Sequence, residues 1–333
     1  MRNKKAIALL SGGLDSTLAL KLILDLGFEV ICLNLKTPFC TCDGKEGVCY
    51  SSKYADEFGI KLIRIFGGED YVEMVKNPKH GYGRNLNPCI DCRIYLFRKA
   101  KEIMEKEGAD FIFTGEVLGE RPMSQRLDAM RLIEKESGLQ GRVLRPLSAK
   151  LLTPTLPEKE GLIDRSKLLN IQGRSRKPQI QLAQTYQIKD YPCPAGGCLL
   201  TDENFARRLK DSFQHGEDSL RHISLLKLGR HFRLPAGAKF IVGRNQEENN
   251  LILTLAESEE LKFTVSGFKS TYGVLLGKPE SEDKVLCARI CARYCQEKNL
   301  SKLVIKVWTE TMENFKEMEV SSATDDQMEL YRV

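Results

Sequence analysis

The stretch KAIALLSGGLDSTLALKLILDLG, from Lys5 to Gly27, decides the fold of the first part of the chain. It starts as a short apolar run, turns at two glycines, and continues with apolar residues at helical spacing up to Gly27, a typical helix C-cap. Glycines at such a turn let backbone N–H groups approach an anion, and the N-terminal end of the helix favours negative charge. The stretch therefore predicts a strand, an anion-binding loop at Ser11–Ser16, and a helix.

Strands and helices alternate through the residues that follow. Apolar runs at 29–37, 60–66 and 109–115 predict strands, and the segments 51–59 and 90–107 predict helices between them. This alternation predicts an α/β fold with a doubly wound parallel sheet. Ligands of such sheets bind at the carboxyl ends of the strands.

The pattern changes beyond about residue 227. Short apolar runs take over, followed by a helix at 283–295 and a last strand at 302–310. We expect a second, smaller α+β domain at 225–333, after a first domain at 1–215. The last dozen residues are polar, and we expect them to be frayed. The other expected strands of the second domain lie at 239–243, 250–255, 261–267 and 271–277.

Length and composition exclude several classes of protein. The 333 residues are 42% hydrophobic and 29% charged, which is a globular composition. No apolar run approaches the roughly 20 residues of a membrane span, and the first one, Ala6–Leu10, is too short for a signal peptide. We therefore expect a cytoplasmic protein rather than a membrane protein, a secreted precursor, a collagen or a disordered chain.

The net charge of +6 is unevenly spread along the chain. Residues 141–180 hold nine Lys and Arg against three Asp and Glu. Clustered basic residues favour a polyanionic partner, and a solvated linker is the alternative. Within this window we expect a basic loop to contact nucleic-acid phosphates through Arg174, Arg176 and Lys177. Further arginines would extend the patch: Arg121, Arg126, Arg142 and Arg145.

Eleven cysteines in a chain of this composition favour metal binding or thiol chemistry over disulfides. Cys89 and Cys92 form a CxxC at the start of a predicted helix, where the helix N-terminus and nearby arginines should lower the pKa of both thiols. A zinc pair, a redox pair and a structural pair all fit a CxxC taken alone. Cys193 and Cys198 form a second element, and the glycines between them suggest close approach of the backbone to a ligand.

The remaining clustered cysteines have plainer explanations. We take Cys40, Cys42 and Cys49 as buried or pocket-lining thiols, with a zinc site as the alternative. The helix at 283–295 would carry three more cysteines on one apolar stripe, which predicts core packing. These are Cys287, Cys291 and Cys295.

The residues SGGLDS at 11–16 resemble the PP-loop of the ATP pyrophosphatase superfamily, whose members cleave ATP to AMP and pyrophosphate by adenylating a carbonyl oxygen. The resemblance implies that Asp15 helps to hold magnesium (Mg2+) and that adenine lies near Leu10 and Leu35. Thr114-Gly115-Glu116 is similar to the family's second glycine motif, so Gly115 is expected to approach the nucleotide. The resemblance also implies that the pyrophosphate end of ATP is cradled by Ser11, Gly12, Gly13, Asp15 and Ser16.

The cysteine layout resembles that of PP-loop enzymes that thiolate tRNA. In those enzymes a CxxC and one distant cysteine hold a [4Fe-4S] cluster and leave one iron open for the sulfur to be transferred. The resemblance assigns the cluster to Cys89, Cys92 and Cys198, with Cys193 as competitor for the third ligand. It makes Asp15 and the three thiols the catalytic residues. Persulfide chemistry on Cys92 and Cys198, without a cluster, is the alternative.

A further motif lies in the second domain. Gly243-Arg244-Asn245, followed by Asn249 and Asn250, resembles the signature of the RNA-binding domain of NFACT proteins. The resemblance implies RNA binding, and a tight turn between strands is the alternative.

Together these features predict a tRNA sulfurtransferase of the PP-loop, thiouridine synthetase type. ATP would adenylate a uridine carbonyl, and sulfur would then replace its oxygen. The expected partners are tRNA and a sulfur donor, either inorganic sulfide or a cysteine desulfurase, with no membrane; a homodimer is compatible with this prediction. The first alternative is a sulfur insertase or amide-forming ligase acting on a small molecule. The second is an RNA-binding protein with a degenerate ATP site.

Overall fold

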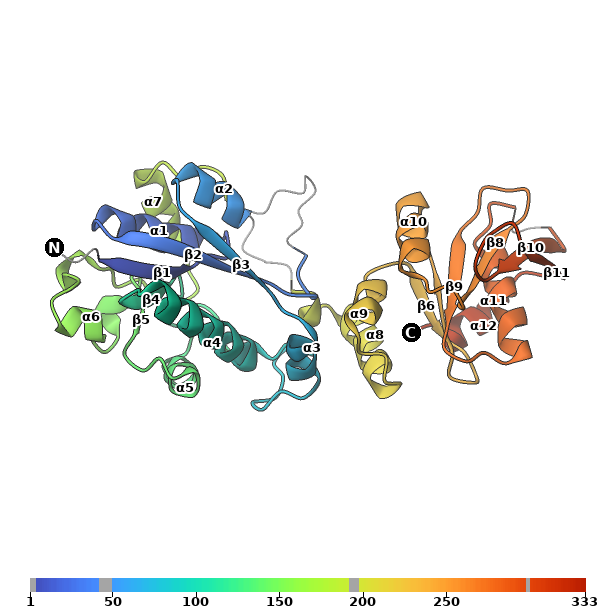
Figure 1. The fold of residues 1–333 in the computed structure, drawn as a ribbon, viewed down its shortest axis with the longest axis horizontal. Helices are drawn as coiled ribbons and strands as arrows, with labels where there is room; N and C mark the ends of the chain where they lie inside the picture. Colours follow the sequence, from blue (N-terminus) through green and yellow to red (C-terminus); the bar gives the residue numbers. More distant parts are fainter. Residues whose placement is uncertain (1–3, 42–49, 192–197, 298–299) are drawn as a thin grey trace. The chain divides into compact units, whose positions relative to one another are not determined.

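The computed structural model describes residues 4–41, 50–191, 198–297 and 300–333. The chain forms two compact units, Met1–Asp202 and Glu203–Val333 (Figure 1). Helix α8 (Glu203–Gln214), which the sequence prediction grouped with the first domain, packs against α9 (Leu220–Leu226). By these contacts α8 belongs to the second unit.

The strands at the centre of the first unit are β1 (Lys5–Leu9), β2 (Glu29–Lys36), β3 (Leu62–Phe66), β4 (Phe111–Thr114) and β5 (Val143–Leu144). They form one parallel sheet in the order β3-β2-β1-β4-β5, which confirms the predicted doubly wound α/β fold. In such sheets ligands bind where the winding direction reverses. Here that place is the crevice between the carboxyl ends of β1 and β4.

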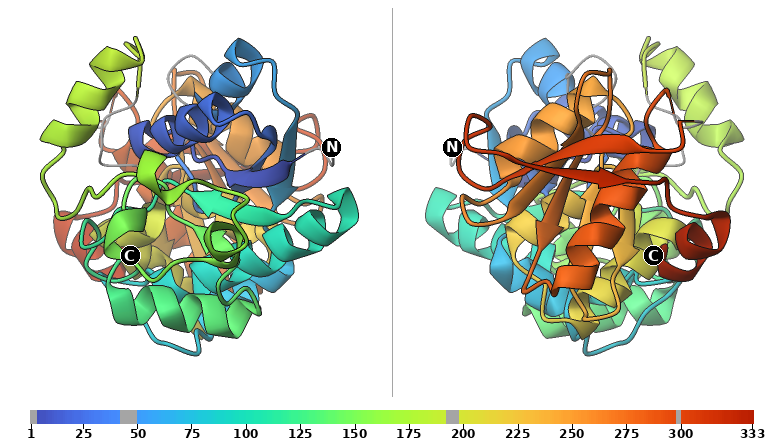
Figure 2. Two further views of the ribbon diagram at one scale, coloured as in Figure 1. Left: turned by 90° about the vertical axis from the view of Figure 1, so that its left-hand side faces the viewer. Right: turned by 90° about the vertical axis from the view of Figure 1, so that its right-hand side faces the viewer.

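Helices cover both faces of this sheet, because its strands bury apolar residues on both sides. In β1, Ala6 and Ala8 pack in one core, and Ile7 and Leu9 pack in the other. One face is covered by α1 (Leu14–Asp25) and α7 (Lys177–Thr185), and the other by α4 (Cys89–Glu107) and α5 (Leu127–Ser137) (Figure 2).

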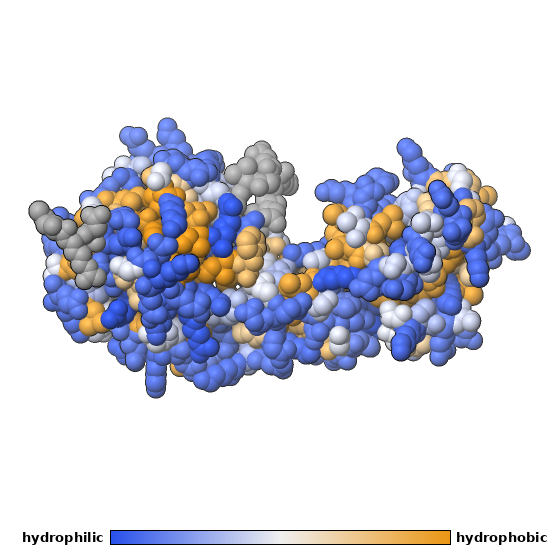
Figure 3. All heavy atoms as spheres, viewed as in Figure 1, coloured by the Kyte–Doolittle hydropathy of each residue, from blue (hydrophilic) through white to orange (hydrophobic). Residues whose placement is uncertain are grey.

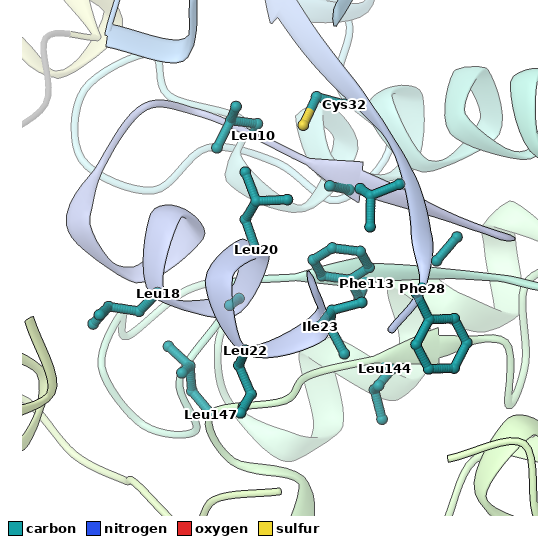
Figure 4. Packing of buried hydrophobic residues seen from close by; sticks show 14 of the residues in the cluster. Leu10, Leu18, Leu20, Leu22, Ile23, Phe28, Cys32, Phe113, Leu144 and Leu147 are labelled. Atoms are coloured by element: carbon teal, nitrogen blue, oxygen red, sulfur yellow. The ribbon is translucent and has the colours of Figure 1, made fainter. Parts of the chain in front are cut away.

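The core beneath α1 is shown in Figure 4. Leu18 and Ile23 of this helix lie with Phe113 of β4 and Cys32 of β2, and all four side chains are fully buried. Burying one such Leu, Ile or Phe side chain contributes roughly 1.5–3 kcal/mol. This packing holds α1 against the sheet, and the loop Ser11–Ser16 leads directly into this helix.

One arginine of the expected basic patch lies inside the first unit. Arg145, directly after β5, is 4% exposed. Its Nε donates to Glu116 Oε2 at 2.9 Å, and its Nη1 donates to Glu134. The expectation that Arg145 extends a surface patch is therefore wrong, since the charges of two carboxylates compensate its burial.

The remaining helical segments of the first unit connect these layers. They are α2 (Tyr50–Glu57), α3 (Glu69–Lys76), α6 (Leu156–Lys159) and the 3-10 helices η1 (Ala149–Leu151), η2 (Arg165–Lys167) and η3 (Leu199–Thr201).

The strands of the second unit are β6 (Arg230–Arg233), β7 (Lys239–Val242), β8 (Leu261–Val265), β9 (Tyr272–Leu276), β10 (Leu303–Trp308) and β11 (Lys316–Val320). They form an antiparallel sheet in the order β11-β10-β8-β9-β7-β6, which confirms a second domain of α+β type. Helix α11 (Ser281–Arg293) packs on one face of the sheet (Figure 2, right) and α10 (Gln246–Leu255) on the other. Cys287, Cys291 and Cys295 are buried in the core under α11, as predicted.

Two sequence predictions for this unit are wrong. Residues 250–255, expected as a strand, belong to α10, whose N-cap Asn245 accepts a hydrogen bond from the Glu248 N–H at 2.9 Å. The polar chain end, expected to fray, forms α12 (Asp325–Tyr331), which Thr324 caps. Both helices begin at a capping side chain, a signal that apolar patterning ignores.

Hydrophilic residues dominate the visible face of each unit (Figure 3). The large apolar side chains with the highest exposure are Phe66 in β3 and Leu330 in α12. Among the described residues, no helix combines the length and the apolar composition that a membrane crossing requires.

His231 of β6 makes the stability of the second unit depend on pH. Its ring is buried, and Nε2 donates to the Leu228 carbonyl oxygen at 2.7 Å. Burial holds the pKa of His231 well below its usual value, so the folded unit binds fewer protons than the unfolded chain does. The stabilising effect of the neutral ring is therefore present above about pH 6.5 and is lost as pH falls below that value.

We expect the free energy of unfolding of the second unit to fall between about pH 7 and about pH 5, by up to about 1.4 kcal/mol per pH unit. Denaturant titration of the full chain measures it through the fluorescence of Trp308, the single tryptophan of the chain. His231→Gln keeps an N–H donor but does not titrate, so its stability should fall less. Equal decreases in both proteins would contradict the role of His231.

Candidate functional site

The loop Ser11–Ser16 directly follows β1 and leads into α1. Ser16 Oγ donates to the Gly13 carbonyl oxygen at 2.8 Å and lies 3.1 Å from Ser11 Oγ. Gly13 is the N-cap residue of α1 and supplies no capping side chain. An anion can therefore take the place that a capping oxygen occupies in other helices.

Two glycines of the site are required by close backbone contacts. Gly12 has a φ of +80°, and a Cβ on it would lie 2.6 Å from the Ser51 backbone nitrogen. A Cβ on Gly115, the residue after β4, would lie 2.4 Å from the carbonyl carbon of Asp15 and from the amide nitrogen of Ser16. The end of β4 thus packs directly on the first turn of α1, in the crevice between β1 and β4.

Charged side chains from separate segments meet at Asp15. Arg176 Nη2 lies 3.5 Å from Asp15 Oδ2, and Gln179 of α7 lies beside the same carboxyl. Burial raises the pKa of Asp15, although the charges of Arg176 and Arg121 oppose the shift. Burial and the Asp15 charge also raise the pKa of Glu120. Carboxylate oxygens such as these are ligands that Mg2+ prefers.

Among the described cysteines, four lie together beyond the carboxyl end of β2. Cys89 and Cys92 lie in the first turn of α4, while Cys40 and Cys198 pair in an antiparallel β-bridge. Cys198 interacts electrostatically with Cys92, Cys40 and Cys89. The Tyr71 hydroxyl of α3 donates to Cys92 Sγ at 3.1 Å. The structure therefore brings the CxxC and the distant Cys198 together.

The protonation of these thiols differs from the sequence prediction. Burial raises the pKa of Cys89 and Cys92, and it raises the pKa of Cys198 to about 12. The charge of Arg93 opposes this rise in pKa at Cys89 and Cys92 but does not reverse it. The predicted lowering is therefore wrong, because desolvation outweighs the nearby positive charge. Such thiols stay protonated near neutral pH until a bound metal or a base takes the proton.

The loop and the thiols are connected through charged residues. Arg121 acts electrostatically on both Asp15 and Cys89. A second connection is the ion pair of Arg93 in α4 with Glu116 after β4, at 3.4 Å. Arg121 therefore lies within electrostatic range of both the loop and the thiol group, and the Arg93–Glu116 ion pair joins the helix of the CxxC to the end of β4.

Leu10 and Leu35, the residues expected near adenine, differ in exposure. Leu10 is 1% exposed, and its carbonyl oxygen accepts a hydrogen bond from Asn34 Nδ2 at 2.8 Å. Leu35, in β2, is half-buried. The Leu10 side chain therefore belongs to the core, and only Leu35 presents side-chain surface.

The three basic residues expected to contact phosphates differ in exposure. Arg174 and Lys177 are exposed, whereas the Arg176 side chain is 17% exposed and pairs with Asp15. Arg174 and Lys177 can meet a polyanion at the surface. Arg176 belongs to the Asp15 part of the site.

The motif Gly243-Arg244-Asn245 forms the turn between β7 and α10. A Cβ on Gly243 would lie 2.1 Å from Asn249 Oδ1, and that oxygen accepts a hydrogen bond from the Tyr272 N–H at 3.1 Å. With Asn245 as helix cap, these residues hold the fold of the second unit.

Tyr71 and Glu120 are residues of the site that the sequence did not single out, and Cys40 is one that it predicted only as a buried or pocket-lining thiol. Each follows one of the parallel strands, so the rule that ligands bind at carboxyl ends was the available signal. Three further cysteines of the prediction, Cys42, Cys49 and Cys193, lie outside the described residues.

Family models match both units of the chain. Residues 2–151 match the family described as thiamine biosynthesis protein (ThiI), and residues 229–332 match the NFACT protein RNA binding domain. One segment of the chain is thus similar to ThiI proteins and another to the NFACT RNA-binding domain. Both resemblances found in the sequence are thereby confirmed.

Curated relatives match part of the chain. The tRNA-specific 2-thiouridylase MnmA of Petrotoga mobilis is 32% identical over 134 residues, which are 35% of this chain and 36% of the relative. The "Probable tRNA sulfurtransferase" of Thermococcus kodakarensis is 27% identical over 178 residues, 54% of this chain and 44% of the relative. The chain thus spans about a third of the length of the first relative and under half of the second.

Solved structures align with the chain loosely. A complex of a 4-thiouridine synthetase with RNA and bound ATP aligns over 66% of this chain and 52% of its own, with 22% identity and a TM-score of 0.36. The U34-tRNA thiolase NcsA from Methanococcus maripaludis with its [4Fe-4S] cluster aligns over 68% and 74%, with 18% identity and a TM-score of 0.34.

Gly115→Ala should strain the PP-loop domain, because the new Cβ would meet the Asp15 backbone at 2.4 Å. We expect a loss of about 1–3 kcal/mol in the free energy of unfolding, the usual cost of overpacking. Denaturant titration followed by circular dichroism measures it. Gly13→Ala is the control, since its φ of −78° suits alanine and its Cβ would meet only Ser11 Oγ, at 3.5 Å. If both variants unfold like the unsubstituted protein, the close contact is not a constraint.

Proposed function

We propose that this protein is an ATP-dependent tRNA sulfurtransferase that produces a thiouridine. A uridine carbonyl oxygen attacks the α-phosphorus of ATP, and the bond to pyrophosphate breaks. Hydrosulfide then attacks the activated carbon, and AMP leaves with the former carbonyl oxygen. One ATP and one hydrosulfide are consumed, and one thiouridine, one AMP, one pyrophosphate and a proton are formed.

The observation that carries this proposal is the placement of two kinds of chemistry near the carboxyl edge of one sheet. Asp15 of the PP-loop and Cys89 of the thiol group both lie within electrostatic reach of Arg121. An adenylating loop alone would suit many ligases, and clustered thiols alone would suit many metal proteins. Their combination with an NFACT-type RNA-binding domain favours a thiolated RNA over a small-molecule product.

In this proposal the residues of the chain bind, orient and exclude water. The PP-loop and the N-terminal end of α1 hold the phosphates of ATP, and Asp15 with Glu120 holds Mg2+. The uridine is turned out of its stack, because its carbonyl carbon is otherwise out of reach. The reaction is accelerated because the residues align the reactants and stabilise the developing charge. Exclusion of water prevents hydrolysis of the adenylated uridine, which would restore its carbonyl oxygen.

We infer that the thiols hold a [4Fe-4S] cluster. Cys198 interacts electrostatically with Cys89 and Cys92, and these three cysteines are a CxxC with one distant partner. A four-iron cluster is held by cysteine thiolates that need not converge on one atom. Cys89, Cys92 and Cys198 would hold it, with Cys193 as the competitor for the third place. When bound, such a cluster supplies an open iron for hydrosulfide; a persulfide on Cys92 or Cys198 is the alternative sulfur carrier.

We infer that tRNA contacts both units. The exposed Arg174 and Lys177 of the PP-loop domain suit phosphate contacts, which carry affinity without sequence information. The NFACT-type domain would supply the remainder of the RNA surface.

The function is tested by nucleoside analysis of tRNA from a strain that lacks this protein. We expect one thiouridine to be missing and to return with the unsubstituted protein but not with Asp15→Ala, which should also form no AMP from ATP. Asp25→Ala is the matched control, because Asp25 lies at the other end of α1 and pairs with Lys21 on the surface. An unchanged set of thionucleosides in the deletion strain would exclude the proposed function.

The sulfur carrier is tested by iron analysis of protein purified without oxygen. We expect brown protein with about four irons per chain. Cys89→Ala, Cys92→Ala and Cys198→Ala should each lose iron and thiolation, whereas Cys295→Ala, in the core of the second unit, should keep both. Iron-free protein that still thiolates tRNA would replace the cluster with the persulfide mechanism.

The same analysis decides between neighbouring cysteines. If Cys193→Ala loses iron and Cys198→Ala retains it, Cys193 is the third cluster ligand in place of Cys198. Cys40→Ala should retain iron, because a CxxC and one distant cysteine suffice. Loss of iron in that variant would make Cys40, the β-bridge partner of Cys198, a further ligand.

A further inference from the structure

Arg176 and Gln179 lie at the start of α7 but are directed into the PP-loop domain. Arg176 Nη2 is 3.5 Å from Asp15 Oδ2, and Gln179 is fully buried. Their neighbours Arg174 and Lys177 are exposed. The packing of α7 against α1 brings this pair of residues to the first turn of α1. One short segment therefore presents some side chains to solvent and others to the site.

Buried polar atoms without a hydrogen-bond partner gather around Asp15. Within the described residues these atoms include Asp15 Oδ1, Glu120 Oε2, Arg176 Nε and both amide atoms of Gln179, which lies beside the Asp15 carboxyl without a hydrogen bond of normal geometry to it. An unpaired buried polar atom is costly, so native proteins rarely keep several of them together for packing reasons alone. Because the atoms come from three separate segments, they indicate a place where a ligand supplies the missing partners.

The chemistry of these groups specifies the ligand. Arg176 and Arg121 offer guanidinium groups, which bind phosphate oxygens. Asp15 and Glu120 offer carboxylate oxygens, which bind a hard divalent cation. A phosphate group that carries such a cation satisfies both sets, whereas an RNA phosphate alone would be repelled by the two carboxylates.

We propose that Arg176, with Gln179 beside it, binds the magnesium-bound pyrophosphate end of ATP rather than tRNA. This inference rests on the proposed ATP chemistry. In the free protein the Arg176 guanidinium offsets the repulsion between Asp15 and Glu120. Once the cation neutralises these carboxylates, Arg176 turns to a phosphate oxygen and stabilises the charge of the departing pyrophosphate.

The test compares Arg176→Ala with Arg174→Ala, two substitutions of the same residue type in one loop. Calorimetric titration with magnesium pyrophosphate and with AMP measures the two ends of the nucleotide site. Arg176→Ala should weaken magnesium pyrophosphate binding about tenfold or more, the loss expected for one charge-assisted hydrogen bond, and should leave AMP binding unchanged. Arg174→Ala should leave both unchanged.

Binding of tRNA at several salt concentrations gives the opposite pattern. Arg174→Ala should reduce the salt dependence by about one phosphate contact, whereas Arg176→Ala should keep the original slope. A lower slope in Arg176→Ala, with unchanged pyrophosphate binding, would overturn the inference and return Arg176 to the RNA surface.

Gln179→Leu separates ligand binding from a structural role. If Gln179 serves the ligand, replacing its unpartnered amide by an apolar group should leave thermal stability unchanged or higher and should weaken magnesium pyrophosphate binding. A loss of stability with unchanged binding would contradict the inference. Arg176→Lys keeps the positive charge and therefore serves as the variant for measurement if Arg176→Ala does not fold.

These outcomes are distinct from failure of the proposed function. Binding of magnesium pyrophosphate is measured without tRNA or a sulfur donor. Arg176-dependent binding in a protein whose loss changes no thionucleoside would reject the sulfurtransferase and keep the inference. If binding does not depend on Arg176 but the protein is an active sulfurtransferase, the inference is rejected and the proposed function is kept.

Discussion

The contact between Gly115 and the backbone of Asp15 and Ser16 is the constraint on which the rest of the site depends. It holds the end of β4 against the first turn of α1, in the crevice where the sheet reverses its winding direction. The next residue, Glu116, pairs with Arg145 inside the unit and with Arg93 in α4. The helix that begins with the CxxC is therefore held relative to the PP-loop through one glycine and one carboxylate.

Desolvation is the second feature that the two parts of the site share. Burial raises the pKa of Asp15 in the loop and of Cys89, Cys92 and Cys198 in the thiol group. In both places burial moves the preference of these donors toward their protonated, uncharged form. A bound cation reverses this preference, because it stabilises carboxylate and thiolate in the same low-dielectric surroundings. The site is therefore suited to ligands that bring positive charge with them.

The sequence predicted the parts of the structure that local pattern controls. Strand–helix alternation gave the parallel sheet, and the six residues SGGLDS gave the position of the loop. The prediction from the sequence failed where contacts join distant segments, or where burial decides whether a side chain is charged. Cys40 meets Cys198 only through the folded chain, Arg145 is drawn inside by two carboxylates, and desolvation outweighs the helix end at the CxxC. The strand prediction at 250–255 was wrong for a local reason. The Asn245 side chain caps the start of α10, and this helix includes the apolar run.

The loop Arg174–Lys177 shows why charge counts along a sequence mislead. Three basic residues within four positions suggest one polyanion, yet Arg176 turns inward to Asp15 while Arg174 and Lys177 face solvent. In the proposed function the loop then serves two polyanions at once, with RNA phosphates outside and pyrophosphate inside. Since only one residue separates Arg174 from Arg176, an RNA backbone held at the surface lies beside the place where ATP is cleaved. In the proposed function these three basic residues therefore have two adjacent tasks rather than forming one RNA-binding surface.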